Sequence, residues 1–255
     1  LKLANGVRQQ VDADAELPDF GHGFEDRDVV PMPMKEEGRR EAADAGRAVE
    51  VFDGALERAR ALEIPYPPEA IDNVVICGMG GSASAADLLL GAYWNRLRAP
   101  LHVVRGYDLP GWPGERTLVI ASSFSGTTEE TLTCAMDAVD RTCPVIGVST
   151  GGKMIAHYRP QGVPVVEPPG APMPRAAGVQ MLACLLVVLE RLQVLPALED
   201  EFEEAREMLA TAVAGYGPAS PTASNPAKQI ALRLRSRLPL IWGAQSTAPI
   251  AYRWK

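Results

Sequence analysis

Cysteine, histidine and aromatic residues are scarce in this 255-residue sequence, and each scarcity excludes a class of protein. The three histidines are too widely scattered to indicate a metal site. The four cysteines occur without a CxxC pair, at Cys77, Cys134, Cys143 and Cys184. Because each lies among apolar neighbours, we interpret them as reduced core thiols of a cytoplasmic protein and not as a disulfide framework.

Basic charge and long hydrophobic runs are lacking as well. The formal net charge is −7 at pH 7, whereas a general nucleic-acid partner requires a basic surface. The first residues are mixed polar and show no signal peptide. The longest apolar stretch, Ala176–Leu195, is interrupted by charged and amide side chains, so it predicts a buried helix and no membrane span. A local cluster of hydrogen-bond donors can still bind a small anion on an acidic protein.

Residues Thr117–Thr131, TLVIASSFSGTTEET, carry the strongest functional pattern. A β-branched apolar run predicts a buried strand, and an acidic turn follows it at the start of a predicted helix. Between them, five of the seven residues Ser122–Thr128 carry hydroxyl groups, and one is a glycine. Hydroxyls and free amides at a helix N-terminus favour an anion, and glycine lets the backbone approach a ligand. An ordinary capped joint is the alternative, but it needs fewer hydroxyls, so we predict a phosphate cradle.

Short apolar strands alternate with helices along the middle of the chain. This alternation predicts an α/β fold with a doubly wound parallel sheet that helices cover on both faces. Ligands of such sheets gather at the carboxyl ends of the strands, where the predicted cradle lies. The predicted strands are Val74–Cys77, Leu101–Val104, Thr117–Ser122, Pro144–Ser149 and Val163–Val166, and the predicted helices cover about residues 36–64, 84–97, 129–139, 153–157, 176–195 and 198–213.

The two ends of the chain differ from this pattern. Residues 1–40 are polar without a sustained hydrophobic period, and we interpret them as a variable segment. Near the other end, a linker at Gly215–Asn225 precedes a predicted strand, Leu238–Trp242, and a turn into a helix. This unit repeats the earlier Val74–Ser82 pattern, so we predict the first strand of a second, similar domain. One strand and one helix cannot bury a sheet, which predicts a fragment or a truncated reading frame.

A glycine-rich turn, Gly78-Met-Gly-Gly-Ser-Ala83, follows the first predicted strand and fits the GxGxxA dinucleotide fingerprint. That fingerprint requires an acidic residue after the second strand, where this chain has Arg105-Gly106-Tyr107, so only a cofactor with a 2′-phosphate suits it. In the alternative, the glycines let a sugar lie against the backbone and Ser82 donates a hydrogen bond. The hydroxyl-rich turn favours the sugar, because a dinucleotide makes no use of a second phosphate site.

These segments together resemble a known family. The matching segments are Val74–Leu90, Arg105–Pro110, Ser123–Thr131 and Pro174–Ala177. They are similar to the sugar isomerase (SIS) domain and, more narrowly, to the bifunctional phosphoglucose/phosphomannose isomerases. Leu238–Lys255 resembles the opening of that family's second SIS domain. The resemblance implies a first SIS domain at residues 41–195, followed at 196–255 by a connecting helix, the linker and the start of a second SIS domain.

The resemblance also implies the residues of a sugar-phosphate site. The phosphoryl group would be held by Ser123, Ser125 and Thr128. Thr127, which stands where the family usually has asparagine, is a further candidate. Gly81 and Ser82 would contact the sugar.

For catalysis, the resemblance places Arg175 beside C1 and C2 of the sugar, where it would stabilise an enediolate. A fixed cation near a developing oxyanion suits this role on chemical grounds alone, whereas a surface arginine after a proline-rich loop is the alternative. Aldose–ketose interconversion also needs a ring-opening group and a carboxylate base. In the family these glutamate, histidine and lysine residues lie beyond the AYRWK segment, so the resemblance implies that this chain lacks them. We therefore predict that the chain binds the sugar phosphate poorly or partly and cannot turn it over.

The resulting hypothesis is an aldose–ketose isomerase of carbohydrate metabolism. It interconverts glucose 6-phosphate or mannose 6-phosphate with fructose 6-phosphate, without a metal or another cofactor, and the resemblance implies a homodimer. The second hypothesis is a non-catalytic SIS module that senses sugar phosphates. Such proteins usually carry a helix-turn-helix domain, and residues 1–40 lack its periodicity and basic charge. An NADP-dependent oxidoreductase is the third hypothesis.

Overall fold

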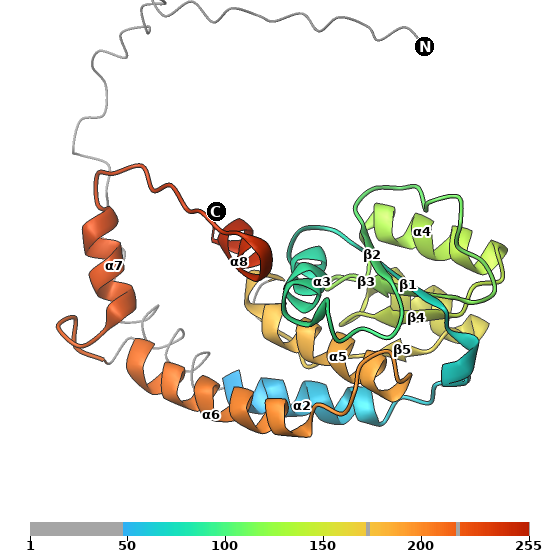
Figure 1. The fold of residues 1–255 in the computed structure, drawn as a ribbon, viewed down its shortest axis with the longest axis horizontal. Helices are drawn as coiled ribbons and strands as arrows, with labels where there is room; N and C mark the ends of the chain where they lie inside the picture. Colours follow the sequence, from blue (N-terminus) through green and yellow to red (C-terminus); the bar gives the residue numbers. More distant parts are fainter. Residues whose placement is uncertain (1–47, 172–173, 218–219, 255) are drawn as a thin grey trace, which may run out of the picture.

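Five parallel strands form the centre of the fold, as the sequence predicts. The computed structural model describes residues 48–171, 174–217 and 220–254 (Figure 1). The strand order is β2-β1-β3-β4-β5, and every neighbouring pair is parallel. The strands are β1 (Asn73–Gly78), β2 (Leu101–Val104), β3 (Thr117–Ser122), β4 (Val145–Val148) and β5 (Val165–Val166). The variable segment predicted at residues 1–40 lies outside the described residues.

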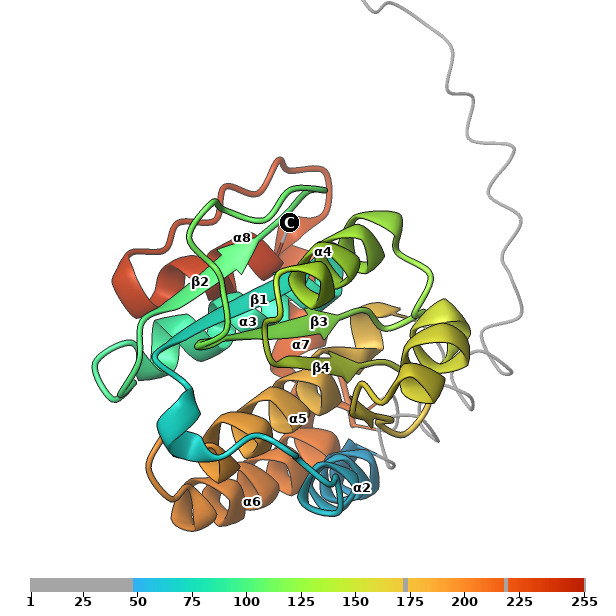
Figure 2. The same ribbon diagram turned by 90° about the vertical axis from the view of Figure 1, so that its right-hand side faces the viewer.

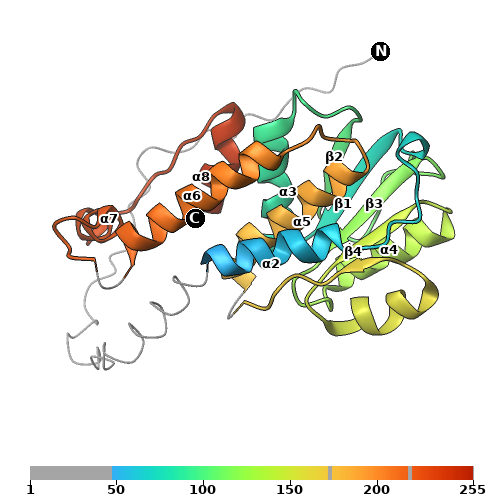
Figure 3. The same cartoon turned by 90° about the horizontal axis from the view of Figure 1, so that it is seen from below.

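Helices cover both faces of this sheet. The α-helices of the described residues are α2 (Ala48–Arg60), α3 (Gly80–Tyr93), α4 (Glu129–Asp140), α5 (Gly178–Arg191), α6 (Glu199–Tyr216), α7 (Pro226–Leu234) and α8 (Ala248–Arg253). Of these, α7 packs on α6 and α8 packs on α3. Shorter helical turns are η1 (Pro68–Ala70), η2 (Met154–Tyr158), η3 (Arg159–Gln161), η4 (Pro174–Ala177) and η5 (Gln245–Thr247). Figure 1 shows α4 above the sheet and α5, α2 and α6 below it, and Figures 2 and 3 show the same layers from two other sides.

The strand side chains alternate between two cores, because successive residues of a strand point to opposite faces. Ile76, Leu118 and Ile120 pack with α2, α3, α5 and α6. Val75 and Val119 pack on the opposite face with α4. All five of these side chains are fully buried, as expected for near-continuous apolar strands in a sheet covered on both faces.

Apart from shifts of a few residues at the ends of elements, such as the end of α2 and the start of β5, the structure differs from the sequence predictions at three places. Helix α3 begins at Gly80 and not near residue 84, and the predicted helix at 153–157 is the single π-helical turn η2. Leu238–Trp242 is not a strand in the structure, so that prediction was wrong. A strand requires a neighbour with which to share backbone hydrogen bonds, and no described strand pairs with this segment. Its terminal side chains are accordingly exposed, Leu238 by 88% and Trp242 by 87%.

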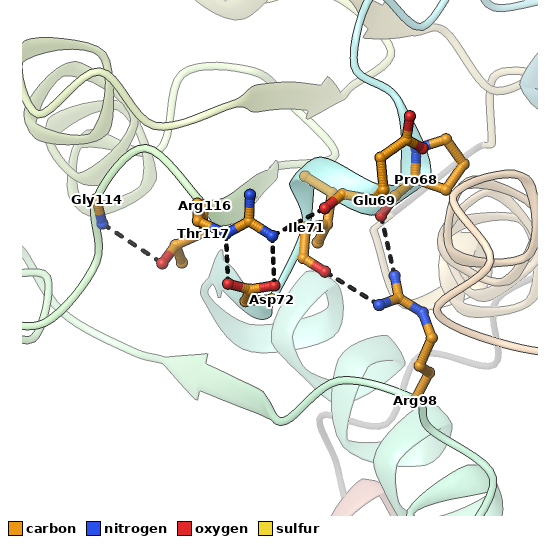
Figure 4. A network of polar contacts seen from close by, with 8 residues as sticks. All are labelled: Pro68, Glu69, Ile71, Asp72, Arg98, Gly114, Arg116 and Thr117. Carbon is orange, nitrogen blue, oxygen red and sulfur yellow. Dashed lines mark hydrogen bonds and ion pairs between the residues drawn. The ribbon is translucent and has the colours of Figure 1, made fainter.

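Two arginines join the loops at the amino end of the sheet, opposite the predicted cradle (Figure 4). Arg116 forms an ion pair with Asp72 and donates to the Glu69 carbonyl oxygen at 2.8 Å. Arg98 donates to the carbonyl oxygens of Pro68 at 3.1 Å and Ile71 at 3.2 Å. Arg98 also reaches two carbonyls that follow α5, those of Leu192 and Gln193. The guanidinium of Arg98 therefore connects the start of β1 to the end of α5.

Replacing Arg98 with methionine is expected to lower stability without weakening ligand binding at the other end of the sheet. The variant loses charge-assisted hydrogen bonds to four partly solvated carbonyls, which we expect to cost about 1–2 kcal/mol and a few degrees in unfolding temperature. Thermal unfolding followed by circular dichroism measures this. Arg235→Met, at an exposed arginine beyond α7, is the matched control. Equal unfolding temperatures for the two variants would show that the Arg98 contacts contribute nothing.

The four cysteines are reduced core thiols, as predicted from the sequence. All four cysteines are free and buried, and burial raises the pKa of Cys184 to about 12, so its thiol is protonated at neutral pH. None of the helices in the described part of the chain has the length and hydrophobicity that crossing a bilayer requires.

Candidate functional site

The predicted cradle lies where the winding of the sheet changes direction. From β1 the chain continues to β2 on one side, whereas β3 lies on the other side of β1. The loops that follow β1 and β3 therefore diverge, and they leave a crevice at the carboxyl edge that is the usual ligand position in such sheets. Gly78 at the end of β1 pairs with Ser122 at the end of β3, so the two loops start side by side.

The loop Ser123–Thr128, here called the β3 loop, is organised around the buried hydroxyl of Ser123. This side chain is 1% exposed. Its Oγ lies 2.9 Å from Thr128 Oγ1 and accepts a hydrogen bond from the Gly126 amide at 3.1 Å. Thr128 is the N-cap residue of α4, but its side chain caps no amide of that helix. The positive end of the α4 dipole is therefore available to an anion at this loop.

Two further hydroxyls of the β3 loop face solvent. Ser125 and Thr127 are both exposed. Ser125 Oγ accepts from the Thr127 amide at 3.3 Å and lies 3.1 Å from Thr127 Oγ1. These contacts hold the two hydroxyls together on the accessible side of the loop, where a phosphoryl group can reach them.

The glycine-rich loop after β1 contacts the β3 loop directly. Ser82 lies in the first turn of α3 and is 7% exposed, and its Oγ accepts from the Phe124 amide at 3.1 Å. Gly81 beside it is half-buried. Gly80 has a φ of +50°, a left-handed conformation that favours glycine. A second helix N-terminus, that of α3, thus opens onto the same crevice.

Arg175 and the acidic first turn of α4 are the other charged groups that concern the predicted site. Arg175 lies in η4, which packs against both α3 and α5; its side chain lies outside what the structure describes. The negative charges of Glu130 and, to a smaller extent, Glu129 raise the pKa of Tyr107 in the loop after β2. The acidic turn of α4 therefore lies close enough to that loop for its charge to be felt there. Within the described residues, no group of three or more His, Cys, Asp or Glu side chains is arranged to hold a metal ion.

A separate cavity of about 820 Å³ lies between α3 and the η5–α8 segment. Trp94, Arg105 and Tyr252 are among its lining residues, and Arg105 forms an ion pair with Asp87 there. None of the predicted site residues lines this cavity. The β3 loop is therefore the candidate site that we develop further, because its hydroxyls are clustered, whereas only Ser246 and Tyr252 bring side-chain hydroxyls to the lining of this cavity.

Two proteins of the same name are similar to most of this chain. A protein of Caldicellulosiruptor bescii named bifunctional phosphoglucose/phosphomannose isomerase is 36% identical over 207 residues, which are 81% of this chain and 61% of that protein. The Thermoplasma acidophilum protein of the same name is 31% identical over 183 residues, 72% of this chain and 53% of that protein. Residues 223–255 match the family model of the bacterial phospho-glucose isomerase C-terminal SIS domain.

The chain is similar in sequence to SIS proteins named bifunctional phosphoglucose/phosphomannose isomerase. The chain spans about three fifths of the length of the Caldicellulosiruptor protein and about half of the Thermoplasma protein.

Solved structures agree with the SIS fold. The C-terminal domain of glucosamine-fructose-6-phosphate aminotransferase from Francisella tularensis superposes with a TM-score of 0.58 at 14% identity, over 90% of this chain and 67% of that one. A Bacillus subtilis structure named as a phosphosugar isomerase gives a TM-score of 0.53 at 22% identity, over 85% and 64% of the two chains. At these identities the likeness establishes the fold alone.

The SIS domain thus brings together most of the residues that the sequence singled out. Ser123 contacts Thr128, and Ser125 contacts Thr127. Ser82 joins them through the amide of Phe124, which lies between Ser123 and Ser125. The sequence reasoning missed the loop after β4, Ser149–Gly152, which packs on the β3 loop. Its Ser-Thr-Gly-Gly sequence at the end of a strand was the signal that could have found it.

Proposed function

We propose that this chain supplies the sugar-phosphate site of an aldose–ketose isomerase that interconverts glucose 6-phosphate or mannose 6-phosphate with fructose 6-phosphate. The observation that carries the proposal is the β3 loop, with its clustered hydroxyls at the N-terminus of α4. Neutral hydroxyls and helix amides suit a phosphoryl group, because they donate hydrogen bonds while the helix dipole offsets part of its charge. The names of the relatives support the same substrate class.

We assign roles to the site residues on this basis. Ser123, Ser125 and Thr128 hold the phosphoryl group, with Thr127 beside them. Gly81 and Ser82 lie against the sugar. Arg175 stabilises the enediolate, since a cation next to a developing oxyanion lowers the barrier to its formation.

We infer that the general base is none of the three carboxylates Glu129, Glu130 and Glu167. Glu167 is held in an ion pair with Arg159 at 3.0 Å. Glu129 and Glu130 belong to the first turn of α4, where their charges complement the helix dipole and act on Tyr107. We therefore assign the proton transfer between C2 and C1 to none of these three carboxylates.

We also propose the larger organisation from the SIS resemblance. Residues 41–195 form the first SIS domain, and residues 196–255 form the connection and the start of the second, which the family-model match at 223–255 supports. We propose a homodimer, which sedimentation equilibrium of the purified chain checks. A cytoplasmic location is consistent with four free, buried cysteines.

Calorimetric titration of the chain with fructose 6-phosphate, fructose and NADP tests the proposal. We expect heat of binding from fructose 6-phosphate alone, because the phosphoryl group provides most of the contacts and the β3 loop is not built for a nucleotide. Fructose is the matched control ligand, since it differs only by the phosphoryl group. Heat from NADP and none from fructose 6-phosphate would instead favour the oxidoreductase hypothesis.

A further inference from the structure

The loop Ser149–Gly152 that follows β4, here called the β4 loop, and the turn after it form hydrogen bonds with two backbone carbonyl groups of the β3 loop. The Thr150 amide donates to the Phe124 carbonyl oxygen at 3.1 Å, and Thr150 Oγ1 donates to the same oxygen at 2.6 Å. Just beyond the loop, the Met154 amide donates to the Gly126 carbonyl oxygen at 2.9 Å. The β4 loop therefore holds two consecutive parts of the β3 loop in place.

The β4 loop is itself rigidly built. Ser149 is fully buried, and its Oγ lies 3.0 Å from the Gly151 carbonyl oxygen and 3.3 Å from the Gly151 amide nitrogen. These contacts fold the loop tightly back on itself. Thr150 is thereby presented to the β3 loop by a framework that does not depend on ligand.

The two loops also pack backbone against backbone. Gly126 and Gly152 have φ values of +66° and +65°. A Cβ on Gly126 would lie 1.9 Å from the Gly151 carbonyl oxygen, and a Cβ on Gly152 would lie 2.3 Å from the Ser125 carbonyl oxygen. Neither glycine leaves room for a side chain, so the close packing of the two loops requires glycine at both positions.

The contacts at Phe124 fix the direction of one particular amide. In a planar trans peptide the carbonyl oxygen and the following N–H point in opposite directions. Because Thr150 holds the Phe124 oxygen toward the β4 loop, the N–H of Ser125 points away from that loop. This N–H donates to no group among the described residues, so it is available to a ligand.

We propose that Thr150 is a positioning residue of the sugar-phosphate site: it orients the Phe124–Ser125 peptide so that the Ser125 amide donates to the phosphoryl group. This inference rests on the proposed function. The amide of Phe124 donates to Ser82 Oγ at 3.1 Å. The peptide groups before and after Phe124 are therefore both held by hydrogen bonds, the first to Ser82 and the second to Thr150. Thr150 acts through the β3 loop and makes no contact with the substrate itself.

Thr150→Val tests this role, because valine keeps the shape of the side chain and removes only the hydroxyl. Losing one of the two hydrogen bonds to the Phe124 oxygen is expected to weaken fructose 6-phosphate binding about 5–20-fold. Thr150→Ser restores the hydroxyl and is expected to bind within about twofold of the wild-type chain. Thr133→Val, at an exposed threonine of α4, is the control for the substitution and is expected to change nothing.

Calorimetry with fructose 6-phosphate and amide hydrogen exchange of the ligand-free proteins together decide between the outcomes. Weak binding by Thr150→Val, rescue by Thr150→Ser and, in the valine variant, faster exchange of the Phe124 amide, which is hydrogen-bonded to Ser82 Oγ, would support the proposal. Unchanged affinity of Thr150→Val, or no rescue by serine, would overturn it. If the wild-type chain does not bind fructose 6-phosphate, the proposed function fails. The exchange rate then still decides whether Thr150 positions the β3 loop, and an unchanged rate would overturn that claim too.

Discussion

Replacing Gly126 with alanine is expected to abolish fructose 6-phosphate binding and to destabilise the chain by about 2–4 kcal/mol. The residue has a φ of +66°, a conformation that strains any residue with a Cβ. The new methyl group would also meet the Gly151 carbonyl oxygen at 1.9 Å and Ser149 Oγ at 2.5 Å. A backbone oxygen in a tightly bonded loop cannot move aside cheaply, so the β3 and β4 loops must separate. Separation disperses the hydroxyls that we propose as phosphoryl ligands.

Calorimetry and thermal unfolding measure the two effects on the same protein sample. Gly111→Ala is the matched control, because Gly111 has no positive φ and a Cβ there meets no atom within 4 Å. We expect this control to keep both its affinity and its unfolding temperature. If Gly126→Ala bound fructose 6-phosphate as tightly as the control, the packing of the two loops would not matter to the site.

Replacing Ser123 with alanine is expected to weaken fructose 6-phosphate binding about 10–100-fold. The substitution removes a proposed ligand of the phosphoryl group. It also removes the partner of the Thr128 hydroxyl and one of the two acceptors of the Gly126 amide, the other being the Ser123 carbonyl oxygen. Because Ser123 is 1% exposed, water does not readily replace these hydrogen bonds. The loop should therefore lose its order at the N-terminus of α4.

The neighbouring Ser122 provides a control of the same residue type and burial. It is fully buried, and its hydroxyl has no hydrogen-bond partner among the described residues. Strand alternation directs it to the face of α3 and α5, away from Ser123. Ser122→Ala is therefore expected to leave the affinity unchanged and to raise stability slightly, since it removes an unsatisfied polar group. Equal losses of affinity for the two alanine variants would show that Ser123 has no special role.

The parts of the fold that were predictable from the sequence are those whose cause is local. The β-branched apolar residues Leu118, Val119 and Ile120 predicted a buried strand, and the structure buries them fully. The sequence also predicted that the hydroxyls of the β3 loop gather at the start of a helix, and the structure places them at the N-terminus of α4; that they hold a phosphoryl group remains our proposal. The contact between Ser82 and Phe124 follows once β1 and β3 pair.

The parts that the sequence did not reveal depend on contacts between distant segments. Leu238–Trp242 has the composition of a strand, but no described strand offers it a partner. Gly80 and Gly81 have low helix propensity, yet they open α3 because the packing of that helix outweighs propensity. The role of Thr150 arises only because β4 lies beside β3, which places it at the Phe124 carbonyl. The Ser-Thr-Gly-Gly sequence of residues 149–152 indicates a loop of interest, but it does not indicate that Phe124 lies beside it.

A crystal of this chain soaked in fructose 6-phosphate tests the central claim most directly. The account predicts density for the phosphoryl group at the N-terminus of α4, within hydrogen-bonding distance of Ser123, Ser125 and Thr128. Density for that group anywhere else, including the cavity between α3 and α8, would contradict it.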